Sequence, residues 1–318
     1  MVDKEMEYSR RGDQVFDALA TKFPSATRTR LLLDQELSAE RFAQIRLSML
    51  AYLSAVLGSP RTLDEPQLCE RLLSHRGKLP NYTSGAMLAP KREHTLEFNM
   101  LHRSVAAAFG DYGIGDHIDG IDLPINVRMV YGQADPTRLK APFASSKLHS
   151  DVWAGVPADA AVIVLPVLGD IDNIYVECME MPRELERRSM RAMKDYDEGR
   201  DVPISVSYEK GMKLGHLYIA DGRLMHQTVR KRPEGVRVSI DFRFRFNDLA
   251  YRAMVPPVEA GGPDSIDSRI PYADWLRIGS DTLVVFEETM EQARAGKREA
   301  SSSPVNTARY HLLPLTRE

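Results

Sequence analysis

The chain has 318 residues, of which 43% are hydrophobic and 27% charged, a balance typical of a globular protein that buries a large core. This composition excludes an intrinsically disordered chain. The formal net charge is -3 and charges of both signs are mixed along the sequence, so we expect neither nucleic acid nor an anionic membrane as a partner.

The two cysteines, Cys69 and Cys178, lie far apart and show no CxxC spacing. They therefore indicate neither a zinc ribbon nor a disulfide framework. The N-terminal stretch MVDKEMEYSRRGDQ lacks the apolar core of a signal peptide, and no run approaches the roughly 20 apolar residues that span a bilayer. We expect a cytoplasmic protein without a membrane partner.

Apolar residues recur at helical spacing in the first third of the chain, as in SAERFAQIRLSMLAYLSAVLG, where Ser38 can cap the first turn. This spacing predicts helices over 10–23, 38–57, 65–76 and 94–109.

A segment rich in Gly and Asp, from Tyr112 to Ile121, predicts a turn and a change of architecture. The strand-like runs that follow, from Leu123 to Phe246, are LPINVRMVYG, KLHSDVWAG, AAVIVLPVLGDI, NIYVECMEM, VPISVSY, HLYIAD and GVRVSIDFRFRF. Such short runs separated by turn signals predict a β-sandwich or barrel rather than alternating βα units. A polar stretch at about 183–198 predicts a helix in a surface insertion, with a solvated charged face.

Beyond residue 250 the chain is rich in Pro and Gly to about residue 270, and one further helix is predicted near 282–296. The C-terminal tail is either mobile or packs as a lid. The chain has no Gly-rich phosphate loop, since GDYGIGDHIDG lacks the strand and helix that would flank such a loop.

Three residues, His149, Asp151 and His226, form a candidate metal site. Residues i and i+2 of a strand face the same side, so His149 and Asp151 can offer an imidazole and a carboxylate to one point while Ser150 faces away. A third imidazole from His226 on another strand completes two histidines and one carboxylate. This ligand set leaves positions open and suits non-haem Fe(II), unlike a closed structural site.

The same spacing argument applies to Arg237 and Ser239, which follow His226 by eleven and thirteen residues. A guanidinium and a hydroxyl on one face form a good receptor for the distal carboxylate of a dicarboxylate co-substrate. The last strand alternates cleanly: Arg237, Ser239, Asp241, Arg243 and Arg245 share one face, and Val238, Ile240, Phe242, Phe244 and Phe246 share the other. We expect the polar face to line a cavity and the apolar face to pack under the N-terminal helices.

At residues 123–246 the sequence resembles the 2-oxoglutarate/Fe(II)-dependent dioxygenase superfamily, whose pattern is HxD, a distal His, and RxS about ten residues later. The resemblance implies a mainly β fold with α-helices: a double-stranded β-helix (cupin-type jelly roll) flanked by N-terminal helices and a C-terminal extension. It implies one catalytic domain over 1–318, with helical support in 1–115, the β core in 120–250 and the extension in 251–318.

The resemblance also implies Fe(II), 2-oxoglutarate and O₂ as cofactor and co-substrates. The carboxylate of Asp151 argues against halogenation, because family halogenases have Gly or Ala there to admit a halide. The stretch LHSDVWAGVPADAAVIVLPV is similar to members from aminoglycoside and carbohydrate biosynthetic clusters. We therefore expect hydroxylation, desaturation, oxidative cyclisation or epimerisation of a small polar metabolite such as a sugar, an aminocyclitol or an amino acid.

Other residues offer alternatives to this assignment. His117 and Asp119 form a second HxD pair without a following strand, and His216 is a rival third ligand. Glu177 and Glu180 lie in a strand-like run, but nothing fixes their direction. Each candidate residue also has a purely structural interpretation: a surface turn for His149 and Asp151, a core position for His226, and a structural ion pair for Arg237.

Three further residues are candidates for substrate binding. Arg128 and Arg243 are polar positions on otherwise apolar strands, so each can hold a substrate carboxylate, the C1 end of 2-oxoglutarate, or a structural partner. Trp153 either walls the substrate pocket or belongs to the core. Loops at 75–95 and 134–147 are expected to shape the mouth. Two alternative functions remain: a metal-dependent cupin enzyme that does not use 2-oxoglutarate, and a non-catalytic carbohydrate-binding jelly roll.

Overall fold

The structure is a computed structural model that describes residues 2–76, 78–79, 86–134, 136–208, 211–256, 269–286 and 310–315. The described part is mainly β-sheet, with antiparallel strand pairing and helices packed around it. None of the described helices combines the length and the hydropathy needed to cross a bilayer.

The four helices predicted for the first third of the chain are present, and the first begins earlier than expected. The α-helices are α1 (Val2–Ala20), α2 (Ala39–Val56), α3 (Glu65–Ser74), α4 (Thr95–Gly110), α5 (Pro136–Leu139), α6 (Glu186–Ser189), α7 (Leu249–Met254) and α8 (Tyr272–Arg277). Local capping explains two of the starts. Ser38 accepts a hydrogen bond from the Arg41 amide at 3.3 Å, and Asp64 accepts one from the Gln67 amide at 2.9 Å, which satisfies an otherwise unpaired first-turn donor of each helix.

Most strands belong to one large and one small antiparallel sheet. The strands are β1 (Thr27–Arg28), β2 (Leu32–Glu36), β3 (Met87–Leu88), β4 (Ile118–Asp122), β5 (Asn126–Tyr131), β6 (Ala160–Gly169), β7 (Ile174–Glu180), β8 (Val206–Tyr208), β9 (His216–Asp221), β10 (Met225–Arg230), β11 (Val236–Phe246), β12 (Arg269–Pro271), β13 (Thr282–Phe286) and β14 (Tyr310–Pro314). In the large sheet β2, β9, β6 and β11 are successive neighbours, and β11 pairs with both β5 and β4. The small sheet has the order β10, β7, β8.

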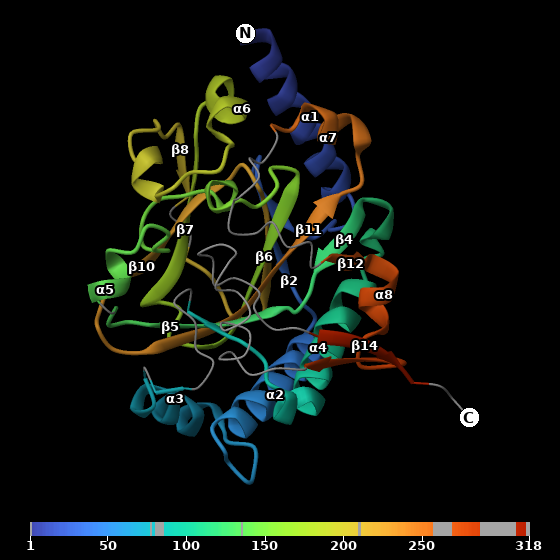
Figure 1. The fold of residues 1–318 in the computed structure, drawn as a ribbon, viewed down its shortest axis with the longest axis vertical. Coiled ribbons are helices and arrows are strands. Elements are labelled where there is room, and N and C mark those ends of the chain that lie inside the picture. The colour runs from blue at the N-terminus through green and yellow to red at the C-terminus, as the bar shows by residue number, and fades with distance from the viewer. Residues whose placement is uncertain are drawn as a thin grey trace, which may run out of the picture.

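Short 3₁₀ helices connect several of these elements. They are η1 (Arg92–His94), η2 (Ile114–Asp116), η3 (Asp151–Ala154), η4 (Arg183–Leu185) and η5 (Tyr196–Gly199). Figure 1 shows the small sheet to the left of β6 and β11, with α1 at the top, α8 on the right, and α2 and α4 toward the bottom.

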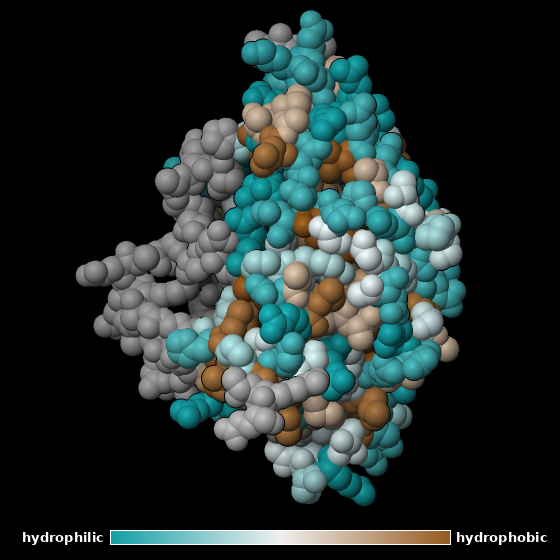
Figure 2. Space-filling view, turned by 90° about the vertical axis from the view of Figure 1, so that its right-hand side faces the viewer, coloured by the Kyte–Doolittle hydropathy of each residue, from teal (hydrophilic) through white to brown (hydrophobic). Residues whose placement is uncertain are grey.

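The apolar face of β11 lies in the main hydrophobic core, as the alternation predicts. Phe242, Phe244 and Phe246 are buried in a cluster that also contains Phe16 of α1 and Phe109 of α4. Because burying a Phe side chain contributes roughly 1.5–3 kcal/mol, this face fixes which side of β11 points to the helices. The molecular surface on the helical side is mainly hydrophilic, with separate hydrophobic residues between (Figure 2).

Three predicted elements differ in the structure. The segment 183–198 holds the short helices η4 and α6 and the start of η5 rather than one helix. Its charged face is largely solvated, as Arg183, Glu184 and Arg188 show, but Glu186 is completely buried. The first part of the helix predicted at 282–296 is the strand β13, whose Val-Val pair suits a strand; residues 287–296 lie outside the described part. The turn predicted at 112–121 ends in the strand β4.

The C-terminal residues that the structure describes pair with β13 rather than covering the mouth. β13 and β14 form a separate two-stranded sheet, and Val284 and Phe286 of β13 are part of the main core beside α4. Of the tail, only residues 310–315 are described, and β14 pairs there with β13; the remaining tail residues, on which the two predicted alternatives also depend, lie outside the described part.

Candidate active site

The two candidate ligand histidines are brought together by backbone pairing. His226 is the second residue of β10, and His149 forms an isolated antiparallel bridge with it. The His149 amide donates to the His226 carbonyl at 3.0 Å, and the His226 amide donates back at 2.7 Å. The imidazole centroids lie 4.3 Å apart, so the pairing places both rings on the same side.

Asp151 reaches the same point from a different backbone conformation than predicted. The run KLHSDVWAG forms no regular strand: Ser150 is extended, and Asp151 begins η3. Because Ser150 between them is extended, the side chains of His149 and Asp151 still point to the same side. Ser150 faces away, since its buried hydroxyl donates to the Gly222 carbonyl at 2.8 Å.

Each ring presents a nitrogen to the centre because its other nitrogen faces the backbone. His149 Nδ1 lies 2.7 Å from the Lys147 carbonyl oxygen, and His226 Nδ1 lies 3.5 Å from that of Leu224. A carbonyl oxygen only accepts, so Nδ1 carries the proton and Nε2 keeps its lone pair. Burial, reinforced by the neighbouring His226, lowers the pKa of His149 to about 3, and a neutral imidazole is the form that binds a metal.

Asp151 is ionised although it is largely buried. Burial by itself raises its pKa, but the positive charge of Arg243, with a smaller contribution from Arg128, outweighs burial and holds the pKa well below its usual range. One carboxylate oxygen, Oδ2, lies 3.4 Å from Arg243 Nε, and Oδ1 lies 3.8 Å from His226 Nε2.

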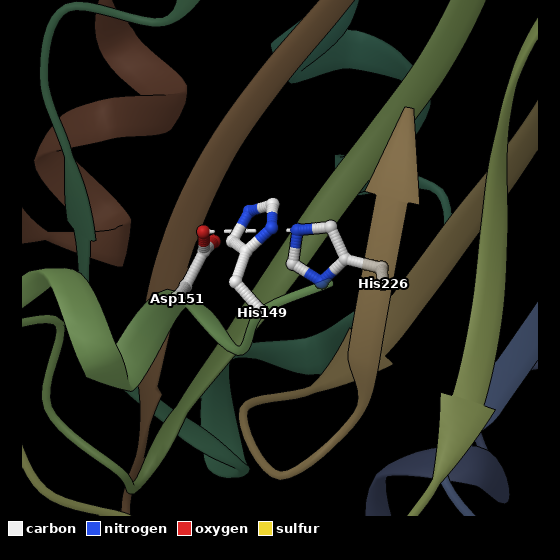
Figure 3. Close-up of side chains that lie close together, drawn as sticks. All are labelled: His149, Asp151 and His226. Atoms are coloured by element: carbon white, nitrogen blue, oxygen red, sulfur yellow. Dashed lines mark ion pairs between the residues drawn. The ribbon is translucent and has the colours of Figure 1, made fainter. Parts of the chain in front are cut away.

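The side chains of His149, Asp151 and His226 form a group, the metal group, that could hold one metal ion. Their ligand atoms all lie within 4.8 Å of one another, and the side chains converge from η3, the bridge and β10 (Figure 3). Two imidazoles and one carboxylate on one side of a centre match the ligand set of non-haem Fe(II) sites, in which further positions stay open. The residues present therefore fit the metal that the sequence implies.

A cavity of about 980 Å³ connects this group to Arg237 and Ser239. Arg237 is 1% exposed, its Nε has no hydrogen-bond partner among the described residues, and its Nη1 contacts only the sulfur of Met212, at 3.9 Å. The buried hydroxyl of Ser239 also has no partner in the described part of the chain. Burial, with the nearby charges of Arg128 and Arg230, lowers the pKa of Arg237 to about 9.

A buried guanidinium without a partner is costly, so the lack of a polar partner for Arg237 Nε and for the Ser239 hydroxyl among the described residues favours a binding site over a structural ion pair. The backbone at the start of β11 holds Arg237 in this position. Gly169 of β6 faces Arg237 with φ +89°, and a Cβ at Gly169 would lie 2.0 Å from the Val236 carbonyl oxygen. Only glycine permits this approach of the two strands.

The polar face of β11 lines the cavity as predicted, from Arg237 to Arg243. Arg128 and Arg243 both line it, but each faces an aspartate: Arg128 pairs with Asp241, and Arg243 with Asp151. The predicted mouth loops also contribute, with Arg76, Ala86 and Met87 from the first loop and several residues between 134 and 146 from the second.

Trp153 lies elsewhere than in the predicted pocket wall. Its side chain is fully buried in a second hydrophobic cluster, and its indole nitrogen donates to the Ser189 carbonyl at 2.9 Å. The 3₁₀ turn at Asp151 breaks the i, i+2 parity that had placed Trp153 beside the carboxylate. The structure therefore places Trp153 in the core, the other of its two predicted positions.

The competing histidines lie outside the metal group. His216 pairs with Asp34 at 2.6 Å on the outer part of the sheet, and His117 ends η2. The sequence did not single out Tyr196, which lines the cavity and stacks on His149. Its position in a polar stretch 47 residues after His149 gave no signal of this contact.

Comparisons with known proteins give structural likenesses only. No protein-family model matches the chain, and neither does any curated protein. Among solved structures, the chain is similar to the non-heme alpha ketoglutarate dependent epimerase SnoN from nogalamycin biosynthesis, with 14% identity, 80% of this chain and 96% of that chain covered, and a TM-score of 0.39.

It is also similar to EctD from S. alaskensis with 2-oxoglutarate and 5-hydroxyectoine, with 15% identity, coverage of 67% and 71%, and a TM-score of 0.31. The Fe(II)/(alpha)ketoglutarate-dependent dioxygenase TqaL matches with 10% identity, coverage of 83% and 97%, and a TM-score of 0.32. SnoN and TqaL are described as alpha-ketoglutarate-dependent enzymes, and the EctD structure contains 2-oxoglutarate. Because all three TM-scores lie below 0.5, the function proposed below depends on the chain's own residues.

Proposed function

We propose that this chain is a non-haem iron oxygenase that uses 2-oxoglutarate to oxidise a small polar metabolite. The proposal depends on one observation: Arg237 and Ser239, buried and with polar atoms that lack a partner among the described residues, share one cavity with the group His149, Asp151 and His226. A set of three metal ligands alone would be consistent with many kinds of enzyme, and a buried positive charge alone could bind many kinds of anion. Both together fit a metal-chelating dicarboxylate.

The strand order supports a double-stranded β-helix. The large sheet contains β5, β11, β6 and β9 as successive neighbours, and the opposing strands are the His149 bridge, β10, β7 and β8. This neighbour order, with the His149 bridge in the place of a fourth strand of the small sheet, is the order that a jelly roll requires. In this arrangement the metal group and Arg237 lie inside the same roll.

The chain's own residues have separate tasks in this proposal. His149, Asp151 and His226 would hold Fe(II) and leave positions open for the 1-carboxylate and 2-keto oxygen of 2-oxoglutarate and for O₂. Arg237 and Ser239 would hold the 5-carboxylate, since a guanidinium and a hydroxyl fix both the charge and the orientation of a carboxylate.

The bound groups supply a coupled oxidation in which 2-oxoglutarate and O₂ become succinate and CO₂, while the remaining oxygen atom oxidises the substrate by two electrons. Hydroxylation, desaturation and oxidative cyclisation all satisfy this balance. The residues that line the rest of the cavity include Thr27, Thr29, Ser207 and Tyr208 among apolar ones, a mixed lining that suits a hydroxylated metabolite such as a sugar or cyclitol. The hydroxyls of Thr29 and Tyr208 donate to the Leu32 carbonyl and to Glu180, so toward a substrate they can act as acceptors.

Product formation tests this proposal. The purified chain with Fe(II), ascorbate and O₂ is expected to convert 2-oxoglutarate slowly to succinate without added substrate, and Asp151→Ala to abolish the conversion because one of the three ligands is lost. A wild-type chain that binds Fe(II) but forms no succinate would favour a cupin enzyme that does not use 2-oxoglutarate.

A further inference from the structure

The carboxylate of Asp151 is divided between two partners. Its Oδ2 faces Arg243 Nε at 3.4 Å, whereas its Oδ1 faces His226 Nε2 at 3.8 Å. Arg243 comes from β11 and lines the same cavity, and both side chains of the pair are largely buried, at 15% and 14% exposure. One oxygen is thus held by the protein, and the other points into the metal group.

A second ion pair decides which carboxylate Arg243 contacts. Asp241 shares the cavity-facing side of β11 and is the nearest competitor, but Asn126 donates to its Oδ1 at 3.1 Å and Arg128 contacts both of its oxygens. With Asp241 satisfied by β5, Arg243 pairs with Asp151 instead. The two pairs lie side by side on the cavity floor.

The geometry matters because a carboxylate can bind a metal through one oxygen or through two. Two-oxygen coordination by Asp151 would occupy one of the positions that 2-oxoglutarate and O₂ need. An arginine held on Oδ2 competes with the metal for that oxygen and leaves Oδ1 as the ligand atom.

We propose that Arg243 is a positioning residue that restricts Asp151 to coordination through one oxygen and so keeps a metal position open for the co-substrate. This inference rests on the function proposed above. In this role Arg243 acts on the candidate metal ligand Asp151 rather than on the substrate. The inference also predicts that loss of Arg243 weakens binding of the co-substrate without weakening binding of the metal, which general damage to the fold does not produce.

Removing the guanidinium removes a positive charge beside the metal and frees Oδ2. Metal affinity is therefore expected to stay the same or to increase in Arg243→Gln, since a cation near a divalent ion is repulsive. Affinity of the metal complex for 2-oxoglutarate is expected to fall about tenfold or more, the usual size of such an effect for a residue that orients a metal ligand. Arg243→Lys keeps the charge without the planar guanidinium, so its affinity for 2-oxoglutarate is expected to lie between those of wild type and Arg243→Gln.

The test uses Co(II), whose visible absorption reports coordination number, in the full chain without O₂. Titration with Co(II), then with 2-oxoglutarate, gives both affinities for wild type, Arg243→Gln and Arg243→Lys. Arg245→Gln is a matched control: Arg245 lies two residues on along the same face of β11 and pairs with Asp159 outside the cavity lining, and Asp159 keeps Arg252 as a second partner at 3.2 Å.

The expected result is unchanged or tighter Co(II) binding, weaker 2-oxoglutarate binding and an altered Co(II) spectrum in Arg243→Gln, with none of these changes in Arg245→Gln. Equal loss of both affinities, or wild-type affinity for 2-oxoglutarate, would overturn the role of Arg243. Failure of the wild-type chain to bind Co(II) or 2-oxoglutarate would instead overturn the proposed function, so the two failures are distinguishable.

Discussion

The ring of Tyr196 stacks on the imidazole of His149, with centroids 4.2 Å apart and an interplanar angle of 14°. The stack is held in place from both sides. The Tyr196 amide donates to the Pro142 carbonyl at 3.0 Å, and the neighbours Asp195 and Asp197 pair with Lys147, whose own carbonyl faces His149 Nδ1. The segment after β7 therefore fixes the ring plane of His149, a candidate metal ligand.

Replacing Tyr196 tests whether this stack orients the ligand. In Tyr196→Ala the imidazole loses the surface that restrains its rotation, and metal affinity is expected to fall about tenfold, as for other residues that orient a ligand. Tyr196→Phe keeps the ring face and is expected to bind nearly as well as wild type. Co(II) titration measures both. Equal affinities for wild type and Tyr196→Ala would show that the bridge to His226 alone orients His149.

A buried ion network joins α1 to the loop that precedes the distal histidine. Arg223 is completely buried and contacts Asp221 at 2.8 Å, Asp13 at 3.0 Å and Glu186 at 3.2 Å. Arg30 contacts Asp13 and Glu186 from the other side. Removal of Arg223 leaves Asp221 and Glu186 buried with less compensation.

Arg223→Gln is accordingly expected to lower the free energy of unfolding by about 3–5 kcal/mol, the cost of breaking a buried ion pair by removing one partner. Urea denaturation followed by circular dichroism measures this change. Arg232→Gln is the control, because Arg232 pairs with Asp170 at 3.2 Å while remaining 63% exposed. It is expected to change stability by less than about 0.5 kcal/mol. Similar losses in both variants would show that the network adds no special stability.

This network also explains why the segment 183–198 could not be predicted correctly. Its charges match a solvated helix, because the sequence does not reveal that Arg30 and Arg223 compensate Glu186 from 156 and 37 residues away. Amphipathic periodicity, by contrast, depends on local order only. For that reason the periodicity correctly predicted α2, α4 and the apolar face of β11.

The candidate site was predictable in identity but not in detail. His149, Asp151 and His226 do converge, although Asp151 begins a 3₁₀ turn rather than continuing a strand. That turn sent Trp153 to the core. The stacking of Tyr196 depends on the course of a long connection, which spacing does not encode.

His102 is expected to make stability depend on pH below neutrality. It is fully buried between Phe98 and Trp275, and burial lowers its pKa to about 3. In the unfolded chain its pKa is near 6.5, so the unfolded state binds the proton first as the pH falls. The stabilising effect of its neutral form is complete above about pH 6.5 and is lost toward pH 3, by up to about 1.4 kcal/mol per pH unit.

Comparison with His102→Gln isolates this effect from that of the carboxylates. The Gln side chain can still donate to the Trp275 carbonyl, which His102 Nε2 faces at 3.2 Å, but it does not titrate. Unfolding free energies at pH 7.5, 6.5, 5.5 and 4.5 (roughly spanning the window set by the two pKa values) are expected to fall less steeply for the variant. Parallel curves would contradict the pKa of His102.

The central claim joins the metal group to the dicarboxylate receptor, and anaerobic absorption spectroscopy tests both at once. Fe(II) and 2-oxoglutarate added to the wild-type chain are expected to give a weak visible charge-transfer band, because the keto acid chelates the metal held by His149, Asp151 and His226. In Arg237→Gln the band is expected to require at least about tenfold more 2-oxoglutarate, since a charged hydrogen bond to the distal carboxylate is lost. No band in the wild type, or the same titration curve in Arg237→Gln, would contradict the assignment.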